Sequence, residues 1–155
     1  MIRSYLTRHG AGPFPTEDVD LKLAEPHNAW GPWQEGFRRG WLDLPLLRYA
    51  VEACGGVDGL AVTHLDGCAA LDWRVATGYR GGQEPELGRF RDLEYQQRLT
   101  RRLQQTEVEY QSVCGAEQLL ELLAGTAPVA VESWGPTSED KKVRLPALFS
   151  RRVAA

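Results

Sequence analysis

Three features are missing from this sequence, and each absence narrows the class of protein. No apolar run is long enough to cross a bilayer, and the first residues lack the apolar core of a secretory signal peptide. Basic residues are not in excess, because 18 lysines and arginines stand against 21 aspartates and glutamates, a net charge of −3. A chain of this charge has no general attraction for nucleic acid. We therefore expect a cytoplasmic protein that binds neither a membrane nor nucleic acid.

Cysteine is also scarce. Cys54, Cys68 and Cys114 are odd in number and show no CxxC or other metal-ligand spacing. We expect reduced, partly buried cysteines and predict no metal-ligating residues. No internal repeat is visible, and a length of 155 residues suits one domain, so we interpret residues 1–155 as a single domain.

The clearest structural signals lie in residues 40–66. Asp43 suits a helix N-cap, and Pro45 fits the first turn, where a missing N–H costs little. An apolar stripe at helical spacing follows and comprises Leu44, Leu47, Val51 and Cys54. Gly55 and Gly56 end this helix, because glycine accepts the left-handed C-cap conformation. Residues 60–62 are then a short, buried strand.

Two polar loops follow strands of this kind. Residues 63–66 leave the first strand, and residues 133–137 leave a second apolar strand predicted at 128–132, which a helix at 117–123 precedes. Open α/β sheets bind ligands at the carboxyl ends of their strands. We therefore expect both loops on one edge of the sheet, with Asp66 as the first candidate for a ligand contact.

The remaining pattern completes an α/β fold, a sheet with flanking helices. Further strands are predicted at residues 1–8, 73–79, 107–113 and 142–145. An amphipathic helix is predicted at residues 92–105, with one face formed by Leu93, Gln96, Leu99 and Leu103.

Two loops near the N-terminus have unusual composition. Residues 9–18 hold two glycines and two prolines, which restrict the chain and suit either a rigid connection or close approach to a ligand. Residues 25–39 show no periodicity and end in Arg38 and Arg39. That pair is either a clamp for a phosphate or carboxylate, or an ordinary solvated pair.

Four motifs in order now resemble the C-terminal part of adenylosuccinate synthetase. Residues 10–17, GAGPFPTE, match the family's GxGPFPTE, and residues 40–43, GWLD, followed by LRYAV, match the helix after its substrate loop. Residues 63–66, THLD, resemble its TKLD, and residues 133–136, SWGP, resemble its SxGP. The resemblance implies part of a fold like that of P-loop NTPases, without the N-terminal phosphate-loop half.

The family joins inosine monophosphate (IMP) to aspartate with GTP and Mg²⁺; GTP first phosphorylates the 6-oxygen of the base, and the aspartate amine then displaces the phosphate. By resemblance, Asp66 accepts hydrogen bonds from the guanine N1–H and 2-amino group, and His64 packs against the base. Ser133 and Gly135 contact the same base, so these four residues are the implied GTP site.

The implied site for IMP and aspartate comprises Gly10, Gly12, Thr16, Arg38 and Arg39. The family's aspartate-binding loop reads TTGRRR, whereas residues 33–39 read WQEGFRR, so only the arginine pair is retained. Specificity for another amino donor or purine is therefore an open alternative.

The family's GDEGKG phosphate loop, whose aspartate is the catalytic base and helps hold Mg²⁺, does not occur in this sequence. His9 and His27 lie in the wrong segments to replace the family's catalytic histidine. The chain is thus expected to hold no catalytic residue and few Mg²⁺ ligands, and to be inactive alone.

Three interpretations follow. The chain is part of a homo-oligomeric ligase completed by a chain carrying the N-terminal half, a non-catalytic guanine-nucleotide-binding module, or a structural remnant that acts in assembly.

Overall fold

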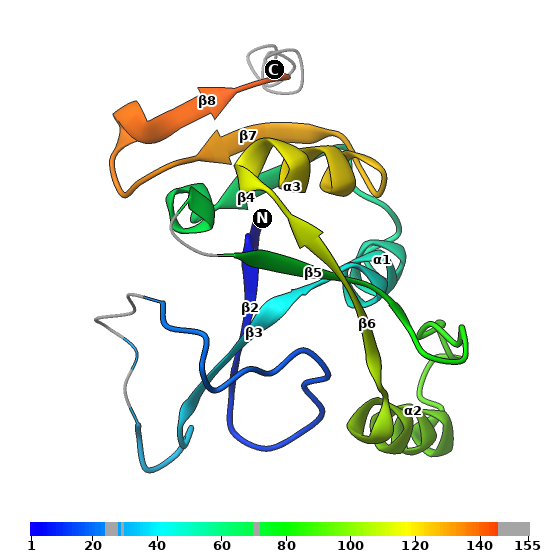
Figure 1. Ribbon diagram of the computed structural model, residues 1–155. Coiled ribbons are helices and arrows are strands. Elements are labelled where there is room, and N and C mark those ends of the chain that lie inside the picture. Colours follow the sequence, from blue (N-terminus) through cyan, green and yellow to red (C-terminus); the bar gives the residue numbers. More distant parts are fainter. Residues whose placement is uncertain (24–27, 29, 70–71, 146–155) are drawn as a thin grey trace, which may run out of the picture.

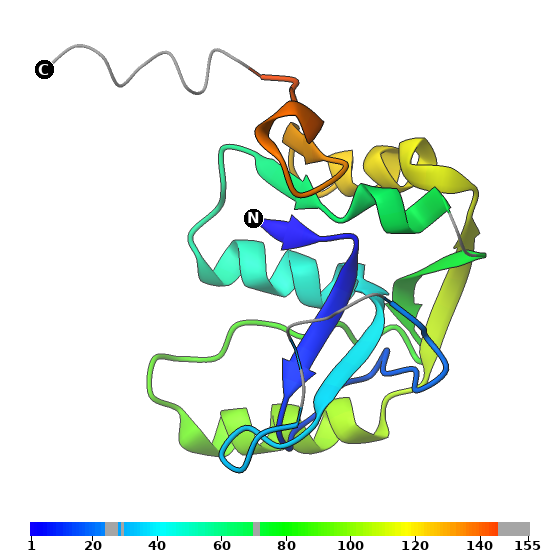
Figure 2. The ribbon, with the colours of Figure 1, turned by 90° about the vertical axis from the view of Figure 1, so that its left-hand side faces the viewer.

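The computed structural model describes residues 1–23, 28, 30–69 and 72–145. Within them the strands form two four-stranded sheets flanked by helices (Figure 1). Helices α3 and α2 lie at opposite ends of the molecule in both views (Figures 1 and 2). The mixed α/β class predicted from the sequence is confirmed, but one sheet was expected and two are present.

Sheet 1 has the strand order β1-β4-β7-β8. Its strands are β1 (Ile2–Arg3), β4 (Leu60–Thr63), β7 (Val129–Ser133) and β8 (Lys141–Val143). β1, β4 and β7 are parallel, with Ile2 beside Val62 and Val62 beside Glu132, and β8 is antiparallel to β7. The carboxyl ends of the three parallel strands therefore meet at one edge of the sheet.

Sheet 2 has the order β2-β3-β5-β6. Its strands are β2 (Tyr5–His9), β3 (Phe37–Asp43), β5 (Trp73–Tyr79) and β6 (Val108–Val113). β3 and β5 are parallel, and the outer pairs are antiparallel. The loop predicted at residues 25–39 is thus too long at its C-terminal end, because residues 37–39 already belong to β3. Residues 24–27 and 29, including His27, lie outside the described residues.

Ser4 explains why the single N-terminal strand predicted at residues 1–8 is two strands. It is fully buried between β1 and β2. Its N–H donates to the Thr63 carbonyl at 2.9 Å, and its hydroxyl donates to the His64 carbonyl at 2.7 Å. Its own carbonyl accepts from the Trp73 indole at 3.2 Å. With every polar group of Ser4 paired, the chain passes from sheet 1 to sheet 2 without an unmatched buried group.

The helices are α1 (Leu44–Ala53), α2 (Leu93–Gln105) and α3 (Gly115–Ala124), with short 3₁₀ helices η1 (Leu65–Ala69) and η2 (Ser138–Asp140). The predicted cap of α1 is confirmed, since the Asp43 side chain accepts from Leu46 N–H. Gly55 and Gly56 follow α1 at φ 76° and 94°, as expected for its stop. Cys54 is exposed, so the predicted apolar face of α1 is one residue too long. Leu93 and Gln96 are both exposed, so the face predicted for α2 is two residues too long.

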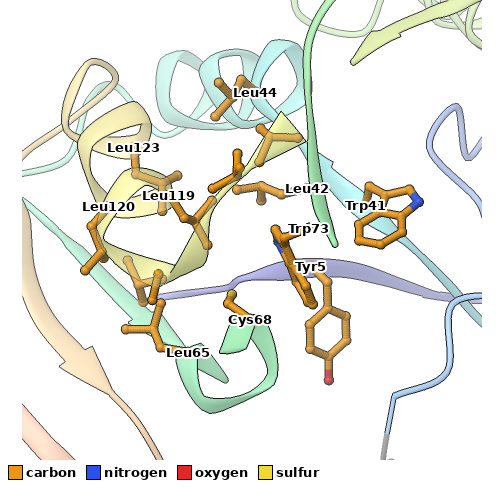
Figure 3. Close-up of a cluster of buried hydrophobic side chains, with 14 of the residues drawn as sticks. Tyr5, Trp41, Leu42, Leu44, Leu65, Cys68, Trp73, Leu119, Leu120 and Leu123 are labelled. Atoms are coloured by element: carbon orange, nitrogen blue, oxygen red, sulfur yellow. The ribbon is translucent and has the colours of Figure 1, made fainter. Parts of the chain in front are cut away.

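The core gathers side chains from both sheets, α1, α3 and η1. Leu119, Leu120 and Leu123 of α3 pack in the same buried cluster as Leu65 and Trp73 (Figure 3). Cys68 is buried there as well, and this burial raises the pKa of its thiol to about 11. All three cysteines are free thiols.

Candidate functional site

A pocket of about 530 Å³ lies at the carboxyl ends of β4 and β7. We call it the strand-end pocket; it is lined by Met1, Ile2, Arg3, Thr63, His64, Asp66, Ser133, Gly135, Pro136 and Lys141. The expectation that the two polar loops share one sheet edge is confirmed, because β4 and β7 are parallel neighbours. The structure thus brings together all four residues of the implied GTP site.

His64 and Asp66 owe their positions to a sharp turn after β4. His64 adopts φ 61°, a left-handed conformation that only a minority of non-glycine residues adopt. Its ring lies 5.4 Å from the Tyr5 ring in an edge contact, and its Nδ1 is 2.9 Å from Thr63 Oγ1. The chain then enters η1, with Asp66 in its first turn, where a plain loop was predicted. The turn therefore fixes the backbone that carries the carboxylate.

The opposite wall is a tightly bonded turn between β7 and β8. The Ser133 hydroxyl donates to the Gly135 carbonyl at 3.2 Å. Asp140 accepts from both the N–H and the hydroxyl of Thr137, at 2.8 and 2.7 Å, and these hydrogen bonds hold its pKa below the usual value. A β-carbon on Gly135 would lie 2.6 Å from the Asp140 carboxylate, so a larger residue there would displace this carboxylate from its hydrogen bonds with Thr137. The pocket wall is therefore organised before any ligand arrives.

Beneath this turn lies Glu132, which sequence reasoning missed. Its side chain is fully buried, and it accepts from the Trp134 indole at 2.9 Å and from the Arg144 guanidinium. A buried carboxylate needs such partners, because removing a charge from water is costly. The sequence signal that could have revealed this residue is a single glutamate within the apolar run of β7.

The residues implied for IMP and aspartate lie elsewhere. The strand-end pocket borders Ser4, at the start of β2, whereas Gly10 follows the far end of this strand. Five strand residues span about 16 Å, so the two groups do not share one pocket. β2 and β3 lie side by side between them (Figure 2).

Arg38 shapes the 10–17 loop from within. Its guanidinium donates to both Glu17 carboxylate oxygens, at 2.8 and 2.6 Å, and to the carbonyls of Gly10 and Gly12, at 2.9 and 3.0 Å. The hydrogen bond from Arg38 lowers the pKa of Glu17, and that of Arg38 is raised in turn. The Arg38 guanidinium is therefore already hydrogen-bonded within its own chain.

The Arg38–Arg39 pair does not form one clamp. Both residues lie in β3, where successive side chains point to opposite faces. Arg39 donates to the Leu23 carbonyl at 3.1 Å instead. Thr16 is fully buried, and its hydroxyl has no hydrogen-bond partner among the residues that the structure describes.

Replacing Arg38 tests its role in the loop. Arg38→Lys keeps the charge but loses the fork on Glu17, so we expect the free energy of unfolding to fall by about 1 kcal/mol. Hydrogen exchange of the 10–17 loop should accelerate. Arg39→Lys is the matched control, because the Arg39 guanidinium donates to the Leu23 carbonyl and forms no fork on a carboxylate in the described part of the chain. Equal effects of the two substitutions would show that the fork does not hold the loop.

The donor set does not fit a metal centre. Within residues 1–23, 28, 30–69 and 72–145, no group of three or more histidine, cysteine or acidic side chains is placed to hold a metal ion. Asp66 is the acidic residue that lines the strand-end pocket. A bound Mg²⁺ would therefore need ligands from outside these residues. In the same described part of the chain, no helix has the length and apolar character to span a membrane.

Comparisons with known proteins converge on one family. Residues 1–125 match the family model described as adenylosuccinate synthetase. The adenylosuccinate synthetase of Halothermothrix orenii is 44% identical over 87 residues, which cover 53% of this chain and 20% of that protein. The Thermotoga maritima enzyme of that name is 41% identical over 99 residues, 61% of this chain and 24% of that protein. The aligned residues thus span a fifth to a quarter of these relatives.

A solved structure gives the same result for the fold. The fully ligated adenylosuccinate synthetase from Plasmodium falciparum superposes with a TM-score of 0.66 at 21% identity. The match covers 92% of this chain and 38% of that one. It therefore extends beyond residue 125, where the family model ends.

Proposed function

Because this chain belongs to the adenylosuccinate synthetase family, we propose that it supplies the guanine-reading pocket of a GTP-dependent ligase that joins IMP and aspartate. The 10–17 loop, with Gly10, Gly12 and Thr16, contributes part of the wall around IMP and aspartate. The proposal rests on one observation: His64, Asp66, Ser133 and Gly135 line a single pocket at the ends of paired parallel strands.

The chemistry of this pocket suits guanine. A carboxylate has only acceptors, and the guanine N1–H and 2-amino group are adjacent donors, so Asp66 pairs with both. Adenine presents no such pair of donors. The His64 ring offers an apolar face to the base, and the turn at Ser133 and Gly135 offers hydroxyl and backbone groups.

In this proposal the chain binds and orients the guanine nucleotide but does not transfer its phosphate. Phosphoryl transfer depends on a positively charged cradle around the phosphates, and the sequence has no glycine-rich loop that ends in lysine before a helix. Mg²⁺ bound with GTP would neutralise phosphate charge, and its protein ligands would come from the half of the fold that carries GDEGKG. We propose that this half is supplied by another chain.

Calorimetry with GDP, GMP and ADP tests the proposal on the pure chain. We expect both guanine nucleotides to bind at least about tenfold more tightly than ADP, because adenine leaves the Asp66 acceptors unmatched. The same preparation should form no adenylosuccinate from GTP, IMP and aspartate. Equal affinity for guanine and adenine nucleotides, or no binding of either, contradicts the guanine pocket. Turnover by the pure chain contradicts the need for a second half.

The second candidate is a non-catalytic guanine-nucleotide-binding module, favoured by the preorganised turn at Ser133 and Gly135. Adding a fragment that carries GDEGKG separates the two: activity appears if the chain is part of a ligase, and only binding remains if it is a module. In the described part of the chain β1, the outermost strand of sheet 1, pairs with β4 alone, and we expect copies of the chain to associate through its other edge. Sedimentation of the chain as a monomer would exclude this route to a homo-oligomer.

A further inference from the structure

Lys141 lines the strand-end pocket, although neither the motifs nor the apolar pattern marked it. It is the first residue of β8 and pairs directly with Ser133 of β7. Directly paired residues of antiparallel strands project their side chains from the same face. The register of sheet 1 therefore places an ammonium group beside the turn that walls the pocket.

The position of this ammonium group is fixed. Lys141 Nζ donates to the Gly135 carbonyl at 2.5 Å and to the Thr137 carbonyl at 2.7 Å. An ammonium group has three donors, so one N–H remains without an acceptor in the described part of the chain. The other cationic side chain of the lining, that of Arg3, lies over the Tyr5 ring at 5.6 Å and donates to the Tyr5 hydroxyl.

Guanine presents an acceptor, its 6-oxo group, directly beside the N1–H that Asp66 reads. We propose that Lys141 donates its third hydrogen bond to the 6-oxo group of the purine and thereby selects 6-oxo over 6-amino bases. This inference rests on the proposed guanine pocket and adds a second reader to it. Asp66 requires the N1–H and the 2-amino group, whereas Lys141 requires the oxygen, so adenine is rejected at two positions.

The test compares GDP with 6-thio-GDP, which keeps the N1–H, the 2-amino group and the diphosphate but carries a weak acceptor at position 6. Lys141→Met keeps the length of the side chain and removes its donors. We expect this variant to bind GDP about tenfold more weakly, the effect of losing one charge-assisted hydrogen bond. Its affinity for 6-thio-GDP should change much less. Lys141→Arg should restore part of the preference, since arginine also donates.

Lys142→Met is the matched control. It removes the same charge from the adjacent position of β8, where the ammonium lies 5.1 Å from the centre of the Trp134 ring. We expect it to leave the ratio of GDP to 6-thio-GDP affinity unchanged. If Lys141→Met loses affinity for both nucleotides equally, Lys141 acts on the phosphates or the turn, and the inference is overturned. It is also overturned if Lys141→Met binds GDP as tightly as the wild type does. Absence of GDP binding by the wild-type chain would overturn the proposed function itself.

Discussion

Asp66→Asn is expected to weaken GDP binding by about 1–3 kcal/mol, roughly a factor of 5 to 150. The variant keeps one side-chain acceptor but replaces the other with an NH₂ group. That group faces a guanine donor, and two donors in contact leave both unpaired. Isothermal titration of the wild type and the variant with GDP measures the loss.

The same substitution should create a new preference, which separates a specific effect from damage to the fold. Xanthine has a carbonyl where guanine has the 2-amino group, so the side-chain amide introduced by Asp66→Asn matches both the N1–H and the 2-oxo group of xanthine. We expect the variant to bind xanthosine diphosphate more tightly than the wild type does.

The matched control removes a carboxylate from the other end of the same strand. Asp58 is exposed in the turn before β4, away from the pocket-lining residues. Asp58→Asn should therefore leave GDP affinity unchanged. Unaltered GDP affinity in Asp66→Asn would mean that Asp66 is only a residue of the turn into η1.

The parts of the fold that were predictable are those governed by local signals. Asp43 and the Gly55-Gly56 pair define both ends of α1, and the apolar runs at β4 and β7 are visible without tertiary information. The division into two sheets was not predictable, because it depends on Ser4. Its three partners, Thr63, His64 and Trp73, lie about sixty or more positions along the chain, and no local pattern records such pairing.

The same distinction applies to the site. Asp66 was predicted as a ligand contact, and the loop that holds Ser133 was predicted to share its sheet edge, because ligand contacts concentrate where parallel strands end. Lys141 was missed, since its place in the pocket follows from the antiparallel register of β8 with β7. Arg38 and Arg39 looked like one clamp as neighbours in sequence, but strand geometry separates their side chains.

Asp43, which the sequence predicts only as the cap of a helix, also makes a contact with a distant part of the chain. Besides capping α1, its carboxylate accepts from the Tyr79 hydroxyl at 2.8 Å and is fully buried where β3 enters the helix. Burial raises the pKa of Asp43 to about 6 from 3.8, outweighing the hydrogen bonds from Leu46 and Tyr79 and the attraction of Arg48. Glu84, which pairs with Arg48, raises this pKa further.

This pKa predicts a pH-dependent stability with a definite sign. Between 3.8 and about 6 the folded state holds a proton on Asp43 that the unfolded state has released. The stabilisation from that proton is complete below the lower value and is lost as pH rises through the upper one. The two values differ by an amount equivalent to about 3 kcal/mol. Asp43→Asn removes this dependence, because asparagine keeps a capping oxygen but does not titrate.

Denaturant unfolding of the wild type and Asp43→Asn between pH 4 and 8 measures the effect. The stability of the variant relative to the wild type should rise by about 2 kcal/mol as pH increases from 4 to 7. Other titrating carboxylates, such as Glu17, are common to both proteins and cancel in the difference. Asp92→Asn controls for loss of a capping carboxylate, because Asp92 accepts from Tyr95 N–H at the start of α2 but is only half-buried. Parallel pH curves for the wild type and Asp43→Asn would mean that water reaches the Asp43 carboxylate, and that β3 and α1 are joined less tightly than their hydrogen bonds indicate.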